Sequence, residues 1–77
     1  MAHMNELVYT VVEGEDNYGF GSFKLFDSEA KARAYAEGRR ERLAHPSMDW
    51  VEEALTGSIA NWRQGCDYMT IFIQEVE

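Results

Sequence analysis

The residues that could form a nucleophilic site are one cysteine, Cys66, and the histidine at position 45. A cysteine nucleophile needs a base within hydrogen-bond reach, and a third group must orient that base. Asp49 or Asp67 could supply the orienting carboxylate. However, His45 follows an expected helix and Cys66 lies in an expected turn, so nothing in the spacing brings the two side chains together. The sequence therefore predicts that the chain is not an enzyme.

Metal and phosphate motifs are also missing from the sequence. No Cys-x-x-Cys or His-x-x-x-His pair is present, as a zinc site would require. Glu13, Glu15 and Asp16 superficially resemble a calcium loop, but the Asp-x-Asp-x-Asp-Gly pattern with a closing glutamate is absent. The glycines at positions 14, 19 and 21 do not lead into a Gly-Lys-Ser/Thr helix start, so we interpret them as turn glycines. We expect no metal and no cofactor.

The charge of the chain indicates which partners to expect. Asp and Glu number 14 against 7 Lys and Arg, which gives a net charge of −7. Such a charge opposes binding to a phosphate backbone and favours a protein partner with a basic surface. Carboxylates on a small rigid body can also imitate the phosphates of a duplex and occupy a groove built for nucleic acid. The alternative is a solvated surface whose charge only maintains solubility. The predicted acidic contacts are Glu13, Glu15, Asp16, Asp49, Glu52 and Glu53.

Aromatic side chains supply a second indication of binding. They make up 13% of the residues, which is more than one small core can enclose. Tyrosine and tryptophan provide large, rigid contact area at the centres of interfaces. We therefore predict that Tyr18, Phe20 and Trp50 contact a partner. The alternative is that Trp50 and Trp62 form half-buried lids over a thin core.

The length of 77 residues predicts a single domain that buries a limited core. A single cysteine cannot form an intramolecular disulfide. Apolar packing must therefore stabilise the fold, and contact with a second copy of the chain can add to that stability. We interpret residues 1–4 as a cloning scar up to a native start at Met4, and residues 5–77 as the domain. No apolar run is long enough to span a bilayer, and we expect a cytoplasmic protein without membrane contact.

The elements expected in the first half are a hairpin and a helix. Residues 7–12 are mostly β-branched or aromatic and predict a strand, residues 14–19 predict a reversal, and residues 20–26 alternate as a second strand, with a bulge at Gly21. Asp27 or Ser28 then provides an N-cap for a helix that ends near residue 43 or 44. Its sheet-facing stripe is expected to contain Ala32, Tyr35, Ala36, Arg39 and Leu43.

The second half is expected to contain a short helix and another hairpin. His45-Pro46 ends the first helix, and the apolar spacing over residues 48–55, followed by Gly57, predicts a two-turn helix. Residues 58–64 fit either a helix or a strand, and we favour a strand. The strongest strand follows, with Met69, Ile71 and Ile73 on one face. The predicted fold is α+β, with three or four antiparallel strands in the order β-β-α-α-β-β, and the long helix packs on one face.

Three stretches carry a resemblance to known proteins: residues 9–19 (YTVVEGEDNYG), 23–35 (FKLFDSEAKARAY) and 69–76 (MTIFIQEV). Their succession of hairpin, helix and strand resembles small proteins encoded by bacteriophages and mobile elements. Within that group, small acidic proteins of one domain resemble anti-CRISPR proteins. The resemblance implies a protein of the host bacterial cytoplasm that binds a Cas effector complex and blocks target-DNA recognition or nuclease recruitment. It implies no catalytic residue.

Composition and resemblance together predict a non-enzymatic inhibitor of a host defence complex, in which the acidic residues block a basic nucleic-acid-binding groove. The alternative is a small homodimeric structural or regulatory module of phage or bacterial origin. In that module a sheet edge or an aromatic patch would pair with a second copy.

Overall fold

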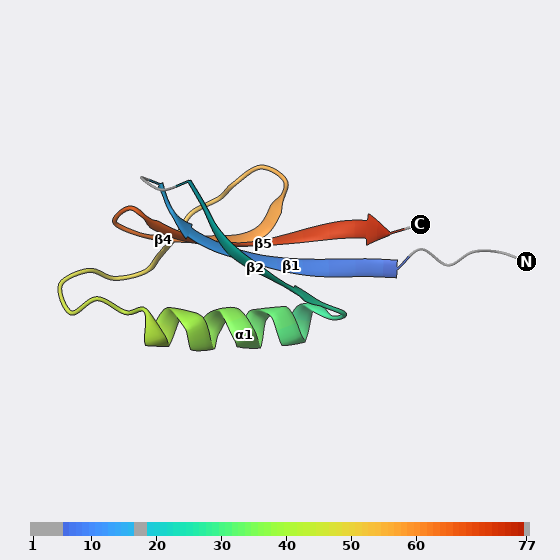
Figure 1. The fold of residues 1–77 in the computed structure, drawn as a ribbon, viewed down its shortest axis with the longest axis horizontal. Coiled ribbons are helices and arrows are strands. Elements are labelled where there is room, and N and C mark those ends of the chain that lie inside the picture. Colours follow the sequence, from blue (N-terminus) through green and yellow to red (C-terminus); the bar gives the residue numbers. More distant parts are fainter. Residues whose placement is uncertain (1–5, 17–18, 77) are drawn as a thin grey trace, which may run out of the picture.

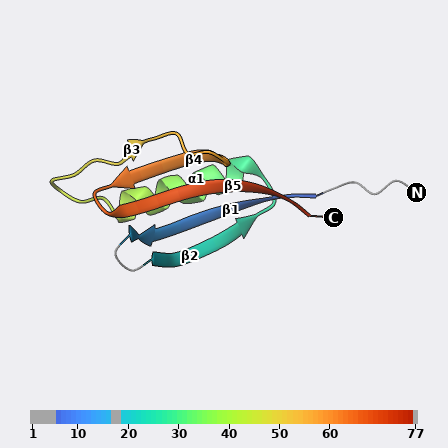
Figure 2. The same cartoon turned by 90° about the horizontal axis from the view of Figure 1, so that it is seen from above.

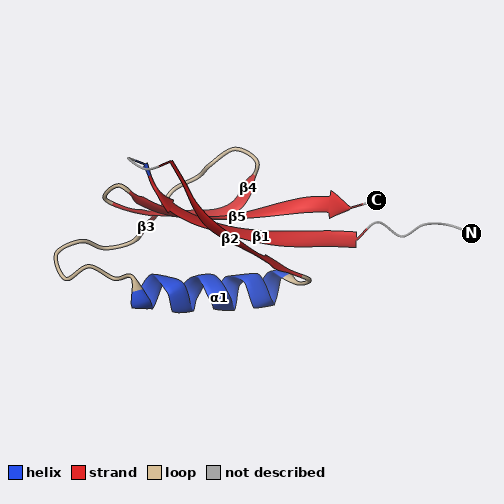
Figure 3. Ribbon diagram, in the orientation of Figure 1, coloured by secondary structure: helices blue, strands red, loops and turns tan. Residues whose placement is uncertain are grey.

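The chain forms one antiparallel sheet whose lower face is covered by a helix (Figures 1 and 3). The computed structural model describes residues 6–16 and 19–76. The strands lie side by side in the order β2-β1-β5-β4-β3 (Figure 2). Among the described residues, no helix is long and apolar enough to cross a bilayer. The elements are β1 (Glu6–Glu15), β2 (Gly19–Phe26), α1 (Glu29–Arg42), β3 (Val51–Glu52), β4 (Ser58–Gln64) and β5 (Asp67–Val76).

The centre of the sheet is the pair β1 and β5, which run antiparallel over ten residues each, from Glu6↔Val76 to Glu15↔Asp67. Both strands are rich in β-branched and aromatic residues, which suit a pleated, half-buried surface. Their alternation places Met69, Ile71 and Ile73 on one face, as expected from the sequence, and this is the face that α1 covers, although Ile73 is exposed. The buried apolar residues are Val11, Ala32, Ala36, Ala60, Trp62, Met69 and Ile71.

Helix α1 begins at the N-cap predicted from the sequence. The side chain of Ser28 accepts a hydrogen bond from the backbone N–H of Lys31 at 3.2 Å, and Arg33 pairs with Glu29 one turn later. Ala32 and Ala36 are fully buried against the sheet. Because these side chains are so small, the helix axis can approach the strands closely. The helix ends at Arg42, with Leu43 as its C-cap, before Pro46.

The end of α1 is held by a side chain from the sheet. Gln64 is 1% exposed, on the helix side of β4. Its amide N–H donates to the carbonyl of Leu43 at 2.9 Å, and its amide oxygen accepts from the N–H of His45 at 2.8 Å. The last carbonyls of a helix have no partner within the helix. Gln64 therefore satisfies one of them and fixes where the chain leaves α1.

The predicted second helix over residues 48–55 is absent, and the order of elements is β-β-α-β-β-β. Val51 and Glu52 form the short strand β3, which pairs with Arg63 and Trp62 of β4. The N–H of Glu53 continues this pairing by donating to the carbonyl of Asn61 at 2.9 Å. A two-turn helix satisfies few of its own backbone groups, whereas the edge of β4 offers partners directly. The sheet therefore has five strands instead of three or four.

The glycines assigned to a turn lie in the hairpin strands instead. Gly14 belongs to β1, and Gly21 lies where the β1–β2 register shifts, which is the expected bulge position. The two backbones are so close that a methyl group added to Gly21 would lie 2.2 Å from the carbonyl oxygen of Glu13. The reversal is shorter than expected, and residues 17 and 18 lie outside the described part. Gly57, expected to end a helix, has a φ of +87° in the turn before β4.

Replacing Gln64 should show how much this side chain stabilises the fold. We expect Gln64→Leu to lower the free energy of unfolding by about 2–4 kcal/mol, because the Leu43 carbonyl and the His45 N–H lose their partners. Chemical denaturation followed by circular dichroism measures this loss. Gln74→Leu, at an exposed position of β5, is the matched control and should change stability little. Equal effects of the two substitutions would contradict a specific role for Gln64.

Two glycines should respond in opposite directions to substitution by alanine. A methyl group on Gly38 of α1 would have no atom within 4 Å. Gly38→Ala should therefore stabilise the protein by about 0.5–1 kcal/mol, because alanine loses less conformational entropy in a helix. Gly21→Ala should destabilise it by more than that amount, since the clash is with backbone atoms. Thermal melts of both variants measure the two effects, and a stable Gly21→Ala protein would contradict the close approach.

Candidate functional site

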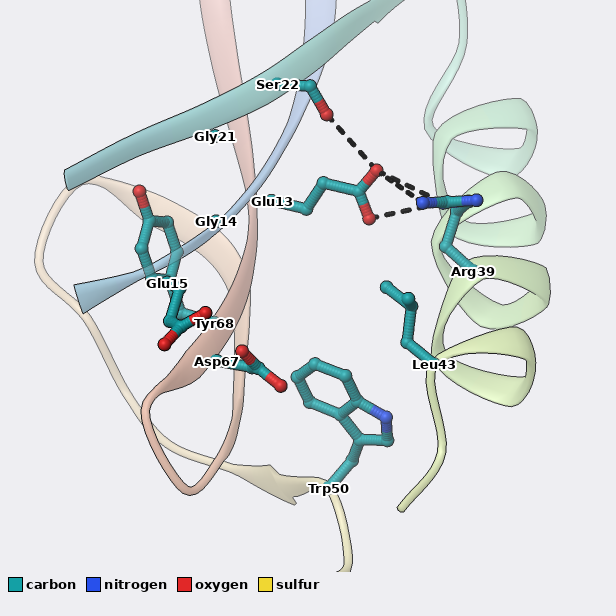
Figure 4. Close-up of a pocket in the computed structure, with 10 residues that line it drawn as sticks. All are labelled: Glu13, Gly14, Glu15, Gly21, Ser22, Arg39, Leu43, Trp50, Asp67 and Tyr68. Carbon is teal, nitrogen blue, oxygen red and sulfur yellow. Dashed lines mark hydrogen bonds and ion pairs between the residues drawn. The ribbon is translucent and has the colours of Figure 1, made fainter. Parts of the chain in front are cut away.

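A cleft lies on the helix side of the sheet, between the C-terminal half of α1 and the adjacent ends of β1 and β5 (Figure 4). Its volume is about 340 Å³. We call it the α1–β1 cleft. Its lining residues come from five segments of the chain: Glu13, Gly14, Glu15, Gly21, Ser22, Arg39, Leu43, Trp50, Asp67 and Tyr68.

An ion pair between sheet and helix forms one wall of the cleft. The Glu13 side chain is 13% exposed, and its Oε1 lies 3.0 Å from Nη2 of Arg39. Arg39 Nε also donates to both carboxylate oxygens, at 3.1 and 3.2 Å, and the Ser22 hydroxyl donates to Oε1 at 3.2 Å (Figure 4). The hydrogen bond to Glu13 raises the pKa of the Arg39 guanidinium above its usual value. The charge of Glu13 is therefore neutralised within the fold.

Two further carboxylates in the cleft lack such neutralisation. Glu15 and Asp67 are directly opposite each other on β1 and β5, and no ion pair to either is found in the described part of the chain. Like charges at directly opposite positions of neighbouring strands repel each other. With Glu13 and Arg39 cancelling, the cleft carries a net charge of −2. A bound cation would relieve the repulsion.

Aromatic and apolar side chains complete the cleft. Trp50 is half-buried, and its indole N–H donates to the carbonyl of Arg40 at 3.0 Å, which holds the ring beside the end of α1. Leu43 lies near Trp50, whereas the ring of Tyr68 lies beside Gly14, away from Trp50 (Figure 4). A cationic group over the face of a tryptophan or tyrosine ring is attracted by the ring quadrupole. The cleft thus combines excess negative charge with surfaces that attract organic cations.

The structure gathers some of the predicted contact residues and separates the others. Glu13 and Glu15, predicted as acidic contacts, and Trp50, predicted as an aromatic contact, all line the α1–β1 cleft. Asp16 lies outside the cleft and pairs with Arg63, and its hydrogen bond raises the pKa of that guanidinium. Tyr18 is outside the described residues. Phe20 belongs to β2, but its side chain is not described.

The remaining acidic residues form a second group at the far edge of the sheet. Asp49, Glu52 and Glu53 are exposed in and around β3, and the last two line a separate shallow hollow. Three strand spacings separate β3 from β1, which corresponds to about 14 Å. The six predicted carboxylates therefore do not form one continuous patch.

Seven of the ten cleft residues were not predicted as contacts, among them Arg39, Leu43, Asp67 and Tyr68. Arg39 and Leu43 were assigned to the sheet-facing stripe, and Asp67 was assigned to a turn. The place of Asp67 in the cleft depends on the pairing of β1 with β5, which puts Asp67, the first residue of β5, opposite Glu15, the last residue of β1. Hydrophobic alternation identifies both strands but does not reveal that they are neighbours.

The histidine and cysteine considered for nucleophilic chemistry are engaged separately. His45 Nδ1 accepts the Ser47 backbone N–H at 3.1 Å and lies 2.9 Å from its hydroxyl oxygen. Cys66 is exposed in the turn between β4 and β5, and no hydrogen bond joins it to His45, both residues being described. Within residues 6–16 and 19–76, no three His, Cys, Asp or Glu side chains are placed to hold a metal ion.

Comparisons of the chain with protein-family models, curated proteins and solved structures find no match. Function must therefore be inferred from the residues of the chain itself.

The ion pair of the cleft should be measurably stronger than an exposed pair. A double-mutant cycle with Glu13→Gln and Arg39→Gln should give a coupling energy of about 1–2 kcal/mol. The Glu13 carboxylate is largely buried and accepts hydrogen bonds from both Arg39 and Ser22. The same cycle on Glu29 and Arg33, an exposed pair within α1, should give about 0.3–0.5 kcal/mol. Urea denaturation measures both cycles, and equal coupling energies would contradict the difference.

Proposed function

We propose that this chain is a non-enzymatic binding protein that receives a basic side chain of a protein partner in the α1–β1 cleft. The observation that supports the proposal most directly is the pair Glu15 and Asp67, two adjacent carboxylates without a cation, beside Trp50. An arginine or lysine from a partner would supply the missing positive charge. Its aliphatic stem could pack on Leu43 and on the Trp50 ring.

The charge of the whole molecule supports a basic partner. At −7 the chain attracts positively charged surfaces at long range, and such attraction raises association rates and weakens with added salt. The exposed carboxylates Asp49, Glu52 and Glu53 around β3 add a second acidic contact. Two to three strand spacings, roughly 10–14 Å, separate β3 from the strands that line the cleft. This separation is similar to the width of a DNA major groove, about 12 Å. Two such groups could occupy neighbouring cationic sites of a groove that binds a duplex.

The more specific proposal is an inhibitor of a Cas effector complex, and it is supported only by the resemblance to anti-CRISPR proteins and by this distribution of charge. It predicts that Glu15→Lys with Asp67→Lys abolishes inhibition of target-DNA cleavage by the effector. Glu52→Lys with Glu53→Lys should weaken inhibition in addition. If both double variants inhibit as well as the unaltered chain, electrostatic mimicry is wrong.

Binding in the cleft can be measured without knowing the partner. N-acetyl-arginine amide, titrated in an NMR experiment, should bind with a Kd in the millimolar range and shift the signals of Glu15, Asp67 and the Trp50 indole. The double variant Glu15→Gln/Asp67→Asn should bind at least tenfold more weakly, because it removes the charge while preserving side-chain shape.

The matched control for this titration is Asp27→Asn/Glu29→Gln, which removes the same number of charges at the N-terminal end of α1, away from the cleft. It should leave binding almost unchanged. Equal weakening in the two double variants would mean that net charge, not the cleft, determines binding. Equal shifts at all exposed carboxylates would lead to the same conclusion.

A further inference from the structure

No helix of the described residues covers the face of the sheet opposite α1, although the loop between β3 and β4 rises on that side (Figures 1 and 2). We call this face the open face. The strand registers arrange its side chains in rows that cross the sheet. One row is Phe23, Val12, Thr70 and Asn61; the next is Leu25, Thr10, Phe72 and Ser58; and on the other side lie Gly14, Tyr68 and Arg63.

The open face is apolar at its β2 side, and its three rows carry little charge. Phe23 and Leu25, on the edge strand β2, are each 57% exposed. Among the residues of the three rows Arg63 alone is charged, and Asp16 pairs with it. An antiparallel sheet with one face in water usually alternates apolar and polar residues, so that its outer face is polar. Phe23 and Leu25 depart from that pattern, so the β2 side of the face is the part that a partner would cover.

A hollow lies on the same face, lined mainly by residues of β4 and β5 and by no described residue of β2. Its volume is about 440 Å³, and Leu55, from the loop between β3 and β4, forms part of its rim. Asn61, 7% exposed, lies in its lining and accepts the hydroxyl of Thr70 at 2.7 Å. Because these two oxygens are bonded to each other, an apolar side chain can enter the hollow without breaking that hydrogen bond. The other lining residues are Val12, Asp16, Arg63, Tyr68 and Phe72.

We propose that a second copy of this chain covers the open face. A two-fold axis parallel to the strands, between β1 and β5, would place β2 of each copy over β4 of the other. The Phe23 side chain of one copy would then lie over the hollow of its partner, and the reverse contact would follow by symmetry. Protrusion and hollow lie on the same face and in the same row, as a self-complementary interface requires.

The distribution of charge makes the open face the surface on which a second copy is least repelled. Two chains of net charge −7 repel each other, and the repulsion is smallest where the facing surfaces carry no net charge. The open face is such a surface. Four strands and three rows cover about 400 Å² in projection, which places the interface among the smallest and weakest complexes. The dimer is therefore expected to be reversible, with a Kd in the micromolar range.

The test is sedimentation equilibrium of the full chain at concentrations from about 10 µM to 1 mM, a range that spans the expected Kd. The mass should rise toward that of a dimer. Phe23→Lys should keep the chain monomeric, although it lowers the net negative charge by one and so reduces general repulsion. Leu25→Lys provides a second variant if Phe23→Lys does not fold. Circular dichroism of each variant checks the fold.

Two further variants distinguish face-to-face packing from other contacts. Leu7→Lys introduces the same charge at an exposed position on the helix side of β1 and should leave the dimer intact. Leu55→Lys changes the rim of the hollow, far from the edge of β2, and should abolish the dimer. A dimer that survives Leu55→Lys but not Phe23→Lys would indicate pairing of β2 edges and would overturn the proposal. A monomer at every concentration, or loss of the dimer in Leu7→Lys, would also overturn it.

Discussion

The distance between α1 and the sheet is set by two methyl groups, those of Ala32 and Ala36, and most other contacts depend on it. Both side chains are fully buried. At this short distance Arg39 reaches Glu13, and the guanidinium of Arg40 stacks on Trp62 with 3.8 Å to the ring centroid. Gln64 also reaches the end of the helix. A larger residue at position 32 or 36 would move the helix outward and weaken all of these contacts together.

The close approach has a local cost at Arg40. Burial lowers the pKa of its guanidinium, and its Nη1 is buried without a hydrogen-bond partner among the described residues. An unpaired buried donor is unfavourable by about 1–3 kcal/mol. The stacking on Trp62 and the Trp50 indole bond to the Arg40 carbonyl offset part of this cost. Both tryptophans are therefore tied to the same turn of α1.

The elements that could be predicted from the sequence are those determined by local patterns. Ser28 caps α1 as expected, and the alternation around Met69 and Ile71 identifies β5 and its buried face. The segment around Val51 was assigned wrongly because its apolar spacing fits a helix, while its conformation is determined by pairing with β4. The α1–β1 cleft could be predicted only in part. Glu15 and Trp50 are recognisable as contact candidates, but the place of Asp67 follows from which strands are neighbours.

The two tryptophans give the molecule optical reporters of two regions. Trp62 is 8% exposed beneath Arg40, so its fluorescence should follow the integrity of the core. Trp50 is half-buried at the wall of the cleft, where its emission depends on what occupies that space. Replacing one indole by phenylalanine at a time would separate the two signals. Unfolding and occupation of the cleft could then be followed independently in one unlabelled sample.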